Sequence, residues 1–268
     1  LNPETRRSGG MHYTSIENIH KVIDPLFLND LKRELAEIKE ITVEKTRTAK
    51  LRDYQTKLAS LTFLDPACGS GNFLTESYLS LRRLENEVLS LLFKDQIVMG
   101  MLNPIKVSIH QFYGIEINDF AVAVAQAALW IAESQMMNAT REIVQIDDDF
   151  LPLKSAAHIV EGNALLIDWK DIVSCEELNY VMGNPPFNGA MTMKNKRSDI
   201  ETAFPECKKI GEVDYVSGWY VKAAKFIEDT NIKCSFVSTN SICQGQAVSL
   251  LWKFLIEQQN IKIDFAYR

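Results

Sequence analysis

The residues with the clearest chemical potential are Asn184, Pro185, Pro186 and Phe187, which follow the apolar run 180–182. Two consecutive prolines fix the backbone and remove two N–H donors, so their carbonyl oxygens stay free to accept hydrogen bonds. The Asn184 oxygen and the Pro185 carbonyl could therefore accept the two hydrogens of a planar amine, while the Phe187 ring stacks on the heterocycle that carries it. A pair of prolines could also simply end a strand.

An exocyclic amine on an aromatic ring is a poor nucleophile, because its lone pair is delocalised into the ring. Two acceptors in tetrahedral directions favour pyramidalisation and aim the lone pair at an electrophilic methyl group, by positioning and preorganised electrostatics. A nucleic-acid base must first leave the helix stack, and an aromatic ring stabilises it once it has flipped out. Residues 184–187 therefore predict a site that modifies an amine.

A second constellation is the glycine turn DPACGSGNF at 65–73, which follows an apolar run and opens an amphipathic segment. Gly69 and Gly71 permit a tight turn and close approach of a ligand to the backbone. A helix that starts near residue 72 adds unpaired N–H groups beside that ligand. The third glycine of the dinucleotide fingerprint is missing, and Asp65 suits a cationic amino group better than a pyrophosphate. The alternative is a purely structural turn.

A third constellation is GIEIND at 114–119, where Glu116 ends an apolar strand. Ligands of open α/β sheets bind at that edge, and an acid there usually accepts ribose hydroxyls. Glu116 lies much farther along the chain than the ~20 residues of a simple nucleotide-binding unit. The long segment 72–111 accounts for the excess. A solvated glutamate is the alternative, and the glycine turn upstream favours the ribose role.

These residues require a sheet to position them, and the hydrophobic pattern supplies one. Helices are predicted over 17–60, and an α/β core over 61–268. Strands are expected near 61–65, 112–117, 157–161, 180–184, 233–239 and 261–267. Helices are expected near 72–93, 119–138, 213–228 and 246–259, and 188–212 is expected to be a loop. The alternation predicts an α/β fold with a mainly parallel sheet covered on both faces.

Composition favours a globular protein and argues against membrane-spanning and metal-binding classes. Of the 268 residues, 46% are hydrophobic and 24% charged, which is typical of a globular protein. Charges interrupt the apolar stretches before ~18 residues, so no membrane-spanning helix is expected. The five cysteines form no Cys-x-x-Cys pair and the four histidines show no ligand spacing, which argues against a metal site and for a reducing cytoplasm. A net charge of -6 argues against a self-sufficient nucleic-acid binder.

The motifs resemble the γ-type adenine-N6 DNA methyltransferases, in particular the methyltransferase module of large type IIG-like restriction–modification proteins. GMHYTS at 10–15 is similar to the family's leading cofactor motif, and EGNAL at 161–165 to its adenine-contacting motif, with Asn163 where an aspartate is often found. The resemblance implies a Rossmann-like fold with a small N-terminal helical segment, 1–60, that carries a cofactor-capping motif. It implies that S-adenosylmethionine is bound by Tyr13, Thr14, Asp65, Ala67, Gly69, Gly71, Phe73, Glu116, Ile117, Asn163 and Ala164.

The resemblance also implies the reaction and the partner. Asn184, Pro185, Pro186 and Phe187 would direct methyl transfer to N6 of an adenine flipped out of double-stranded DNA. We expect the chain to be an excised piece, whose missing target-recognition domain supplies many of the DNA contacts and so accounts for the acidic balance. N4-cytosine, RNA-adenine and protein-glutamine methylation stay open. C5-cytosine methylation is disfavoured, because no cysteine directly follows a proline.

Overall fold

The computed structural model of the chain describes residues 14–93, 104–144, 157–187 and 197–267. Its centre is a sheet of five strands in which every neighbouring pair is parallel. The strands are β1 (Phe63–Asp65), β2 (Phe112–Glu116), β3 (His158–Glu161), β4 (Tyr180–Gly183) and β5 (Lys233–Phe236). Their order is β3-β2-β1-β4-β5. The chain therefore adds β2 and β3 on one side of β1, and then adds β4 and β5 on the other side. The predicted Rossmann-like α/β fold is confirmed.

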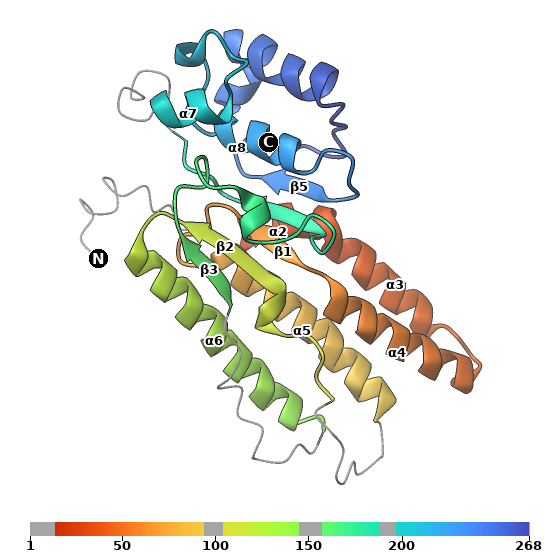
Figure 1. Cartoon of the computed structure of the whole chain (residues 1–268). Coiled ribbons are helices and arrows are strands. Elements are labelled where there is room, and N and C mark those ends of the chain that lie inside the picture. The colour runs from red at the N-terminus through yellow and green to blue at the C-terminus, as the bar shows by residue number, and fades with distance from the viewer. Residues whose placement is uncertain (1–13, 94–103, 145–156, 188–196, 268) are drawn as a thin grey trace.

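Helices cover both faces of this sheet (Figure 1). One side carries α2 (Ile16–Ile23), η1 (Asp24–Leu28), α3 (Asn29–Lys39), α4 (Glu44–Ser60), α5 (Asn72–Leu92) and α6 (Asp119–Arg141). The other side carries α7 (Arg197–Ala203), α8 (Ser217–Phe226), η7 (Val248–Trp252) and η8 (Phe254–Gln258). Short helical turns are η2 (Ile109–Gln111), η3 (Trp169–Asp171), η5 (Ile210–Glu212) and η6 (Asn240–Cys243).

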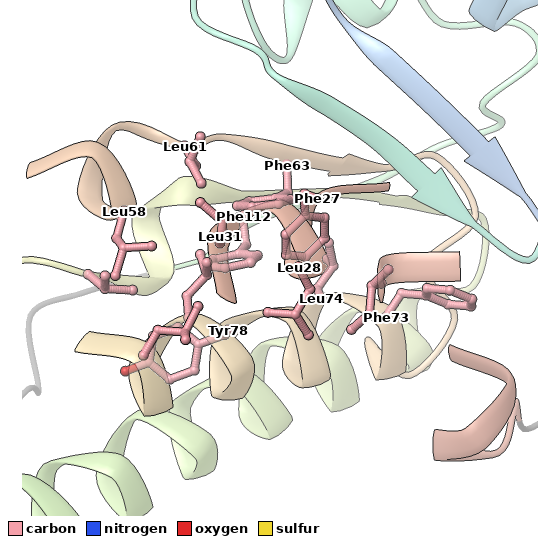
Figure 2. Close-up of a cluster of buried hydrophobic side chains, with 14 of the residues drawn as sticks. Phe27, Leu28, Leu31, Leu58, Leu61, Phe63, Phe73, Leu74, Tyr78 and Phe112 are labelled. Atoms are coloured by element: carbon pink, nitrogen blue, oxygen red, sulfur yellow. The ribbon is translucent and has the colours of Figure 1, made fainter. Parts of the chain in front are cut away.

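The N-terminal helices share a hydrophobic core with the sheet, which we call the first core cluster (Figure 2). Phe63 of β1 stacks on Phe112 of β2, with ring centroids 5.0 Å apart. Phe27 of η1 approaches Phe63 at 5.0 Å from the helical side, and Tyr78 of α5 meets Phe112 edge-on at 5.8 Å. Aromatic pairs at these distances stabilise a core beyond the area they bury. The helices of 16–60 are thus packed directly beneath β1, β2 and β4.

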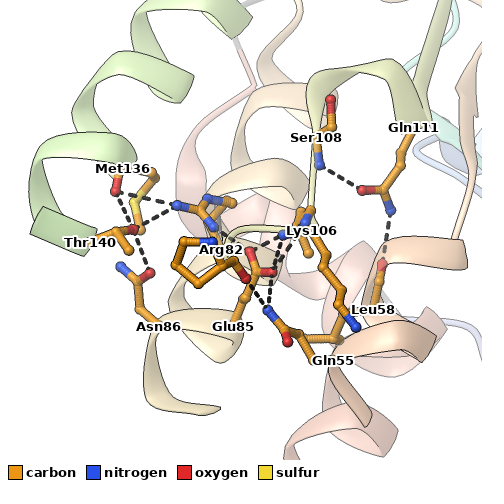
Figure 3. A network of polar contacts seen from close by, with 12 residues as sticks. Gln55, Leu58, Arg82, Glu85, Asn86, Lys106, Ser108, Gln111, Met136 and Thr140 are labelled. Carbon is orange, nitrogen blue, oxygen red and sulfur yellow. Dashed lines mark hydrogen bonds and ion pairs between the residues drawn. The ribbon is translucent and has the colours of Figure 1, made fainter. Parts of the chain in front are cut away.

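A polar network is enclosed among α4, α5, α6 and the segment 104–107 (Figure 3). Arg82 and Glu85 of α5 are almost completely buried and form an ion pair. Glu85 also accepts hydrogen bonds from the Gln55 side chain at 2.8 Å and the Lys106 backbone N–H at 2.6 Å. Arg82 donates to the Thr140 hydroxyl of α6 at 2.7 Å. A buried charge pair is tolerated when such additional hydrogen bonds satisfy it, and here they join three helices.

Two predicted elements are wrong. Residues 261–267 form no strand, although their alternation suggested one. Ile263 is 56% exposed and Tyr267 68% exposed, and only Ile261 and Phe265 pack partly against the core. Within the described part of the chain no strand pairs with this segment, and a strand needs a hydrogen-bonded neighbour. Within the predicted loop 188–212, residues 197–203 are the helix α7, because Ile200 and Ala203 are buried in a second core cluster, which α7 forms with α8 and its neighbours.

The helix α6 is long and apolar enough, by length and composition, to cross a membrane, and it is the one such helix among the described residues. One such helix is weak evidence, because core helices have the same composition. Ala125 and Leu129 are completely buried, and α6 packs along α5, β2 and β3. We therefore interpret α6 as a core helix of the α/β fold.

Candidate active site

The predicted site residues lie at the point where the strand order of the sheet reverses, between β1 and β4. β1 lies between β2 and β4, so the turn after β1 and the segment after β4 leave adjacent strands at the same edge. Ligands of open α/β sheets bind in the crevice formed at such a switch point. The topology therefore brings the glycine turn 65–73 beside residues 184–187, more than a hundred residues later in the chain.

The glycine turn has the predicted geometry. Gly69 and Gly71 have φ angles of 53° and 81°, a left-handed conformation that glycine adopts without strain. Gly71 is the cap from which α5 begins at Asn72. A Cβ at Gly71 would lie 3.1 Å from Ala125 of α6, whereas a Cβ at Gly69 would meet nothing within 4 Å. Gly71 thus permits close helix packing, and Gly69 presents open backbone.

Glu116 joins the end of β2 to this turn. Its Oε2 accepts a hydrogen bond from the Gly69 backbone N–H at 3.0 Å, and its Oε1 accepts one from the Asn118 N–H at 3.0 Å. The Gly162 N–H donates to the Glu116 carbonyl at 2.8 Å, which links the ends of β2 and β3. Glu116 and the glycine turn, predicted to act together, are therefore in direct contact.

Asp65 is the buried acid of the site, with 1% of its surface exposed. Its Oδ1 accepts a hydrogen bond from the Ala67 N–H at 3.0 Å. Burial raises the pKa of the Asp65 carboxyl from its ordinary value near 3.8 to about 8, and the negative Glu116 adds to the increase. At neutral pH this carboxyl is therefore mostly protonated, unless a positive group lies beside it.

Gly183 is a site residue that the motif analysis did not identify. A Cβ on Gly183 would lie 2.3 Å from Asp65 Oδ1, which is far inside van der Waals contact. Only a glycine lets the end of β4 approach the Asp65 carboxyl so closely. The one signal in the sequence is that Gly183 directly precedes Asn184.

We expect Gly183→Ala to lower the free energy of unfolding by about 1–3 kcal/mol, the usual cost of overpacking a tight site. Gly211→Ala is the matched control, because a Cβ at Gly211 would meet nothing within 4 Å. Denaturant titrations of both variants would compare them with the unchanged protein. Equal stability of the Gly183 and Gly211 variants would contradict the close approach to Asp65.

Asn184 has an amide whose two ends differ in their surroundings. Its Nδ2 donates a hydrogen bond to Thr14 Oγ1 at 3.0 Å. Its Oδ1 is buried and has no hydrogen-bond partner among the described residues. Leaving a buried acceptor unsatisfied costs about 1–3 kcal/mol, and such atoms are rare in folded proteins. The oxygen is the group that the motif predicts to accept a substrate amine.

The rest of the motif flanks this amide. Pro185 is buried, while Pro186 and Phe187 are half-buried. Phe187 packs against the hydrophobic cluster formed by α7, α8 and their neighbours. The Phe187 ring is therefore partly fixed by its packing against this cluster.

Asn163 participates in a contact that the sequence did not predict. Its side-chain oxygen accepts the Leu165 N–H at 3.0 Å, and its Nδ2 donates to Asp199 Oδ2 at 3.0 Å. The Tyr215 hydroxyl donates to the same Asp199 oxygen at 3.0 Å. A carboxylate is thus present beside Asn163, supplied by α7. No sequence signal marked Asp199, because 188–212 has no clear periodicity.

The other predicted cofactor residues have different surroundings. Ile117 is 67% exposed directly after β2, whereas Ala164 is buried. The Phe73 side chain lies in the first core cluster (Figure 2). Tyr13 lies outside the described residues. Among the described residues, no three His, Cys, Asp or Glu side chains are grouped closely enough to hold a metal ion.

Comparisons with known proteins identify close relatives. A family described as "MmeI, DNA-methyltransferase domain" matches residues 41–268. The chain is 40% identical to DNA methyltransferase A of Bacillus subtilis, over 99% of this chain and 30% of the relative. It is 26% identical over 55% of its length to the adenine-specific methyltransferase PglX of Streptomyces coelicolor, of which it covers 13%.

Solved structures agree with the sequence comparison. The type IIL restriction–modification enzyme MmeI, solved in complex with DNA, superposes with a TM-score of 0.87 at 41% identity, over 96% of this chain and 34% of that one. The type ISP enzyme LlaGI, at 14% identity and a TM-score of 0.53 over 92% of this chain and 19% of that one, shares the fold. The chain thus spans about a third of the length of MmeI and of the Bacillus subtilis relative.

Proposed function

Because this chain belongs to the family of MmeI DNA-methyltransferase domains, we propose that it transfers a methyl group from S-adenosylmethionine to N6 of an adenine flipped out of double-stranded DNA. The observation that carries this proposal is the Asn184 side-chain oxygen, which is buried and unpartnered at the switch point of the sheet. Asn184, Pro185, Pro186 and Phe187 are the proposed catalytic residues.

The residues around the glycine turn fit the proposed cofactor. S-adenosylmethionine supplies an electrophilic methyl group and also carries a cationic ammonium. A buried Asp65 with a raised pKa gains most from a positive neighbour, since that neighbour stabilises its charged form. Glu116 accepts a hydrogen bond from the Gly69 N–H at the end of β2, which supports its proposed role as the acceptor of the ribose hydroxyls. Asn163 and Ile117 lie at the ends of neighbouring strands and are the proposed adenine contacts.

The chain's own contribution to the reaction is to hold an amine. Asn184 Oδ1 accepts a hydrogen bond from one N6–H and the Pro185 carbonyl accepts one from the other, which directs the nitrogen lone pair out of the plane of the ring. Once methylated, the amine releases its extra proton to solvent. Phe187 stacks on the flipped base and replaces part of the stacking that the base loses. Positioning and electrostatics thereby account for catalysis without a covalent intermediate on the protein.

The choice of adenine over its alternatives rests on two observations. Asn184 precedes and Phe187 follows the two prolines, whereas the N4-cytosine enzymes that the motif resembles more often carry serine or aspartate before them and tyrosine after them. The relative PglX is described as adenine-specific. N4-cytosine, RNA-adenine and protein-glutamine methylation are the alternatives that the direct experiment separates.

We further propose that the reaction serves a cytoplasmic restriction–modification system and that a target-recognition domain supplies sequence specificity. MmeI is a restriction–modification enzyme solved with DNA, and the net charge of -6 of this chain is unfavourable for gripping phosphates alone. Residues 1–268 by themselves should therefore bind duplex DNA weakly.

The direct test is to incubate the intact protein with methyl-labelled S-adenosylmethionine and duplex DNA, and to digest the product to nucleosides. The expected label is in N6-methyl-2′-deoxyadenosine. Label in N4-methyl-2′-deoxycytidine would favour the cytosine alternative. Parallel incubations with RNA and with protein would assign the remaining alternatives, and label in either with none in DNA would overturn the proposal.

Asp65 should release a proton when the cofactor binds at pH 7. Its carboxyl is mostly protonated in the free protein, because its pKa is raised to about 8, and a neighbouring ammonium favours the charged form. Calorimetric titration with S-adenosylmethionine in phosphate and in Tris should give different heats, because the two buffers take up the released proton with different enthalpies. The raised pKa of Asp65 also affects stability. Between about pH 4 and about pH 8 the carboxyl is ionised in the unfolded chain but protonated in the folded one, so its contribution lowers the free energy of unfolding as pH rises through this range.

Asp65→Asn provides the control, because the amide keeps the shape of the side chain and has no proton to release. Its binding heats should agree between the two buffers after correction for affinity. Equal heats in both buffers for the unchanged protein would contradict the prediction, because they would show that Asp65 releases no proton when the cofactor binds.

A further inference from the structure

Thr14 and Asn184 come from distant parts of the chain, 170 residues apart, and meet at the active site. The Asn184 amide nitrogen donates to Thr14 Oγ1 at 3.0 Å, while the amide oxygen has no partner within the described part of the chain. Thr14 itself is 8% exposed, so water has little access to this bond. In this arrangement the hydroxyl accepts from the NH₂ end of the amide, and the oxygen end meets no protein donor in the described part of the chain.

The position of Thr14 is set by the helices beneath the sheet and not by the segment after β4. Ser15 caps α2, accepting the Asn18 N–H on its side chain at 3.4 Å and the Ile19 N–H on its carbonyl at 3.0 Å. Ile19 and Ile23 of α2 are buried in the first core cluster. Because Thr14 directly precedes this capped and buried helix, its backbone position is fixed, and its hydroxyl can orient the Asn184 side chain.

The orientation matters because the ends of an amide have opposite hydrogen-bonding character. An Asn184 rotated by 180° would present an NH₂ group to the substrate amine, so that two donors would face each other. We propose that Thr14 is a positioning residue that holds the NH₂ end of Asn184 and thereby keeps Oδ1 directed at the substrate amine. This inference rests on the proposed function, and it differs from the cofactor contact that the family resemblance implies for Thr14.

The test compares Thr14→Val, which keeps the shape and removes the acceptor, with Thr14→Ser, which restores it. In the intact protein, Thr14→Val should lower kcat about 10-fold, the effect of losing one orienting hydrogen bond. The KM for DNA and the calorimetric Kd for S-adenosylmethionine should stay within about 2-fold, because binding groups are untouched. Thr14→Ser should recover most of the lost kcat. Thr46→Val, on the exposed surface of α4, is the matched control and should leave kcat unchanged.

Two results would overturn the inference while leaving the proposed function intact. One is an unchanged kcat in Thr14→Val. The other is a weaker Kd for S-adenosylmethionine at unchanged kcat, which would make Thr14 a cofactor ligand. The double variant Thr14→Val/Asn184→Ala should lose no more activity than Asn184→Ala alone, since the hydroxyl acts through that amide. The proposed function itself would instead be overturned if the unchanged intact protein put no label into DNA.

Discussion

Replacement of Asn184 by alanine should lower kcat for methyl transfer by about 100-fold or more, the scale seen when one preorganised hydrogen-bonding group is removed from an active site. The variant loses the buried oxygen that has no partner in the protein and with it the acceptor for the amine. The affinity for S-adenosylmethionine should change by only a few fold, because Asp65 and Glu116 are unaltered. Single-turnover methylation of duplex DNA and calorimetric cofactor titration would measure the two effects separately.

Asn138→Ala is the control for this variant. Asn138 is an exposed residue near the far end of α6, so the same chemical change there should leave kcat and cofactor affinity unaltered. Turnover near the wild-type rate in Asn184→Ala would show that the amide is not catalytic. A large loss of cofactor affinity in that variant would assign Asn184 to cofactor binding.

Glu85→Ala should lower the free energy of unfolding by about 3–5 kcal/mol, the cost of removing one partner of a buried ion pair. Arg82 would remain almost fully buried without its carboxylate. The backbone N–H groups of Lys106 and Val107 and the Gln55 side chain would lose an acceptor at the same time. A denaturant titration that reports on this domain would measure the difference.

Glu87→Ala supplies a close control, because it makes the same substitution two residues along α5. Glu87 pairs with Lys39 at 2.6 Å, but both side chains are more than 40% exposed. Exposed pairs contribute about 0–1 kcal/mol, so the Glu87 variant should be nearly as stable as the unchanged protein. If the two variants lose equal stability, burial does not determine the strength of the Glu85 contacts.

The sequence was sufficient to predict the sheet because each strand carries its own local signal. Apolar runs at 112–116 and 180–183 would be strands in most contexts once helices separate them. Residues 261–267 have the same alternation without a paired neighbour, and that condition is not local. The helix α7 was missed for the opposite reason, since its seven residues fold against a cluster formed elsewhere in the chain.

The site was predictable to the extent that each motif lies at the end of a strand. The direct bond between Gly69 and Glu116 follows from that placement. Contacts between residues without a shared motif were not predictable, and these include Gly183 with Asp65 and Asn163 with Asp199. Such contacts depend on the order of strands and the depth of packing, which only the three-dimensional structure supplies.

The contact between Gly71 and Ala125 has a consequence for how this fold can evolve. A Cβ at Gly71 would lie 3.1 Å from both the Cα and the Cβ of Ala125, so the space between α5 and α6 is already filled by the smallest side chains. A larger side chain at position 125 would clash with the backbone at Gly71 and push the turn that presents Gly69 away from α6. Ala125 has no motif around it, yet the lineage should admit only glycine, alanine or serine there, and a protein engineer should treat it as part of the binding loop.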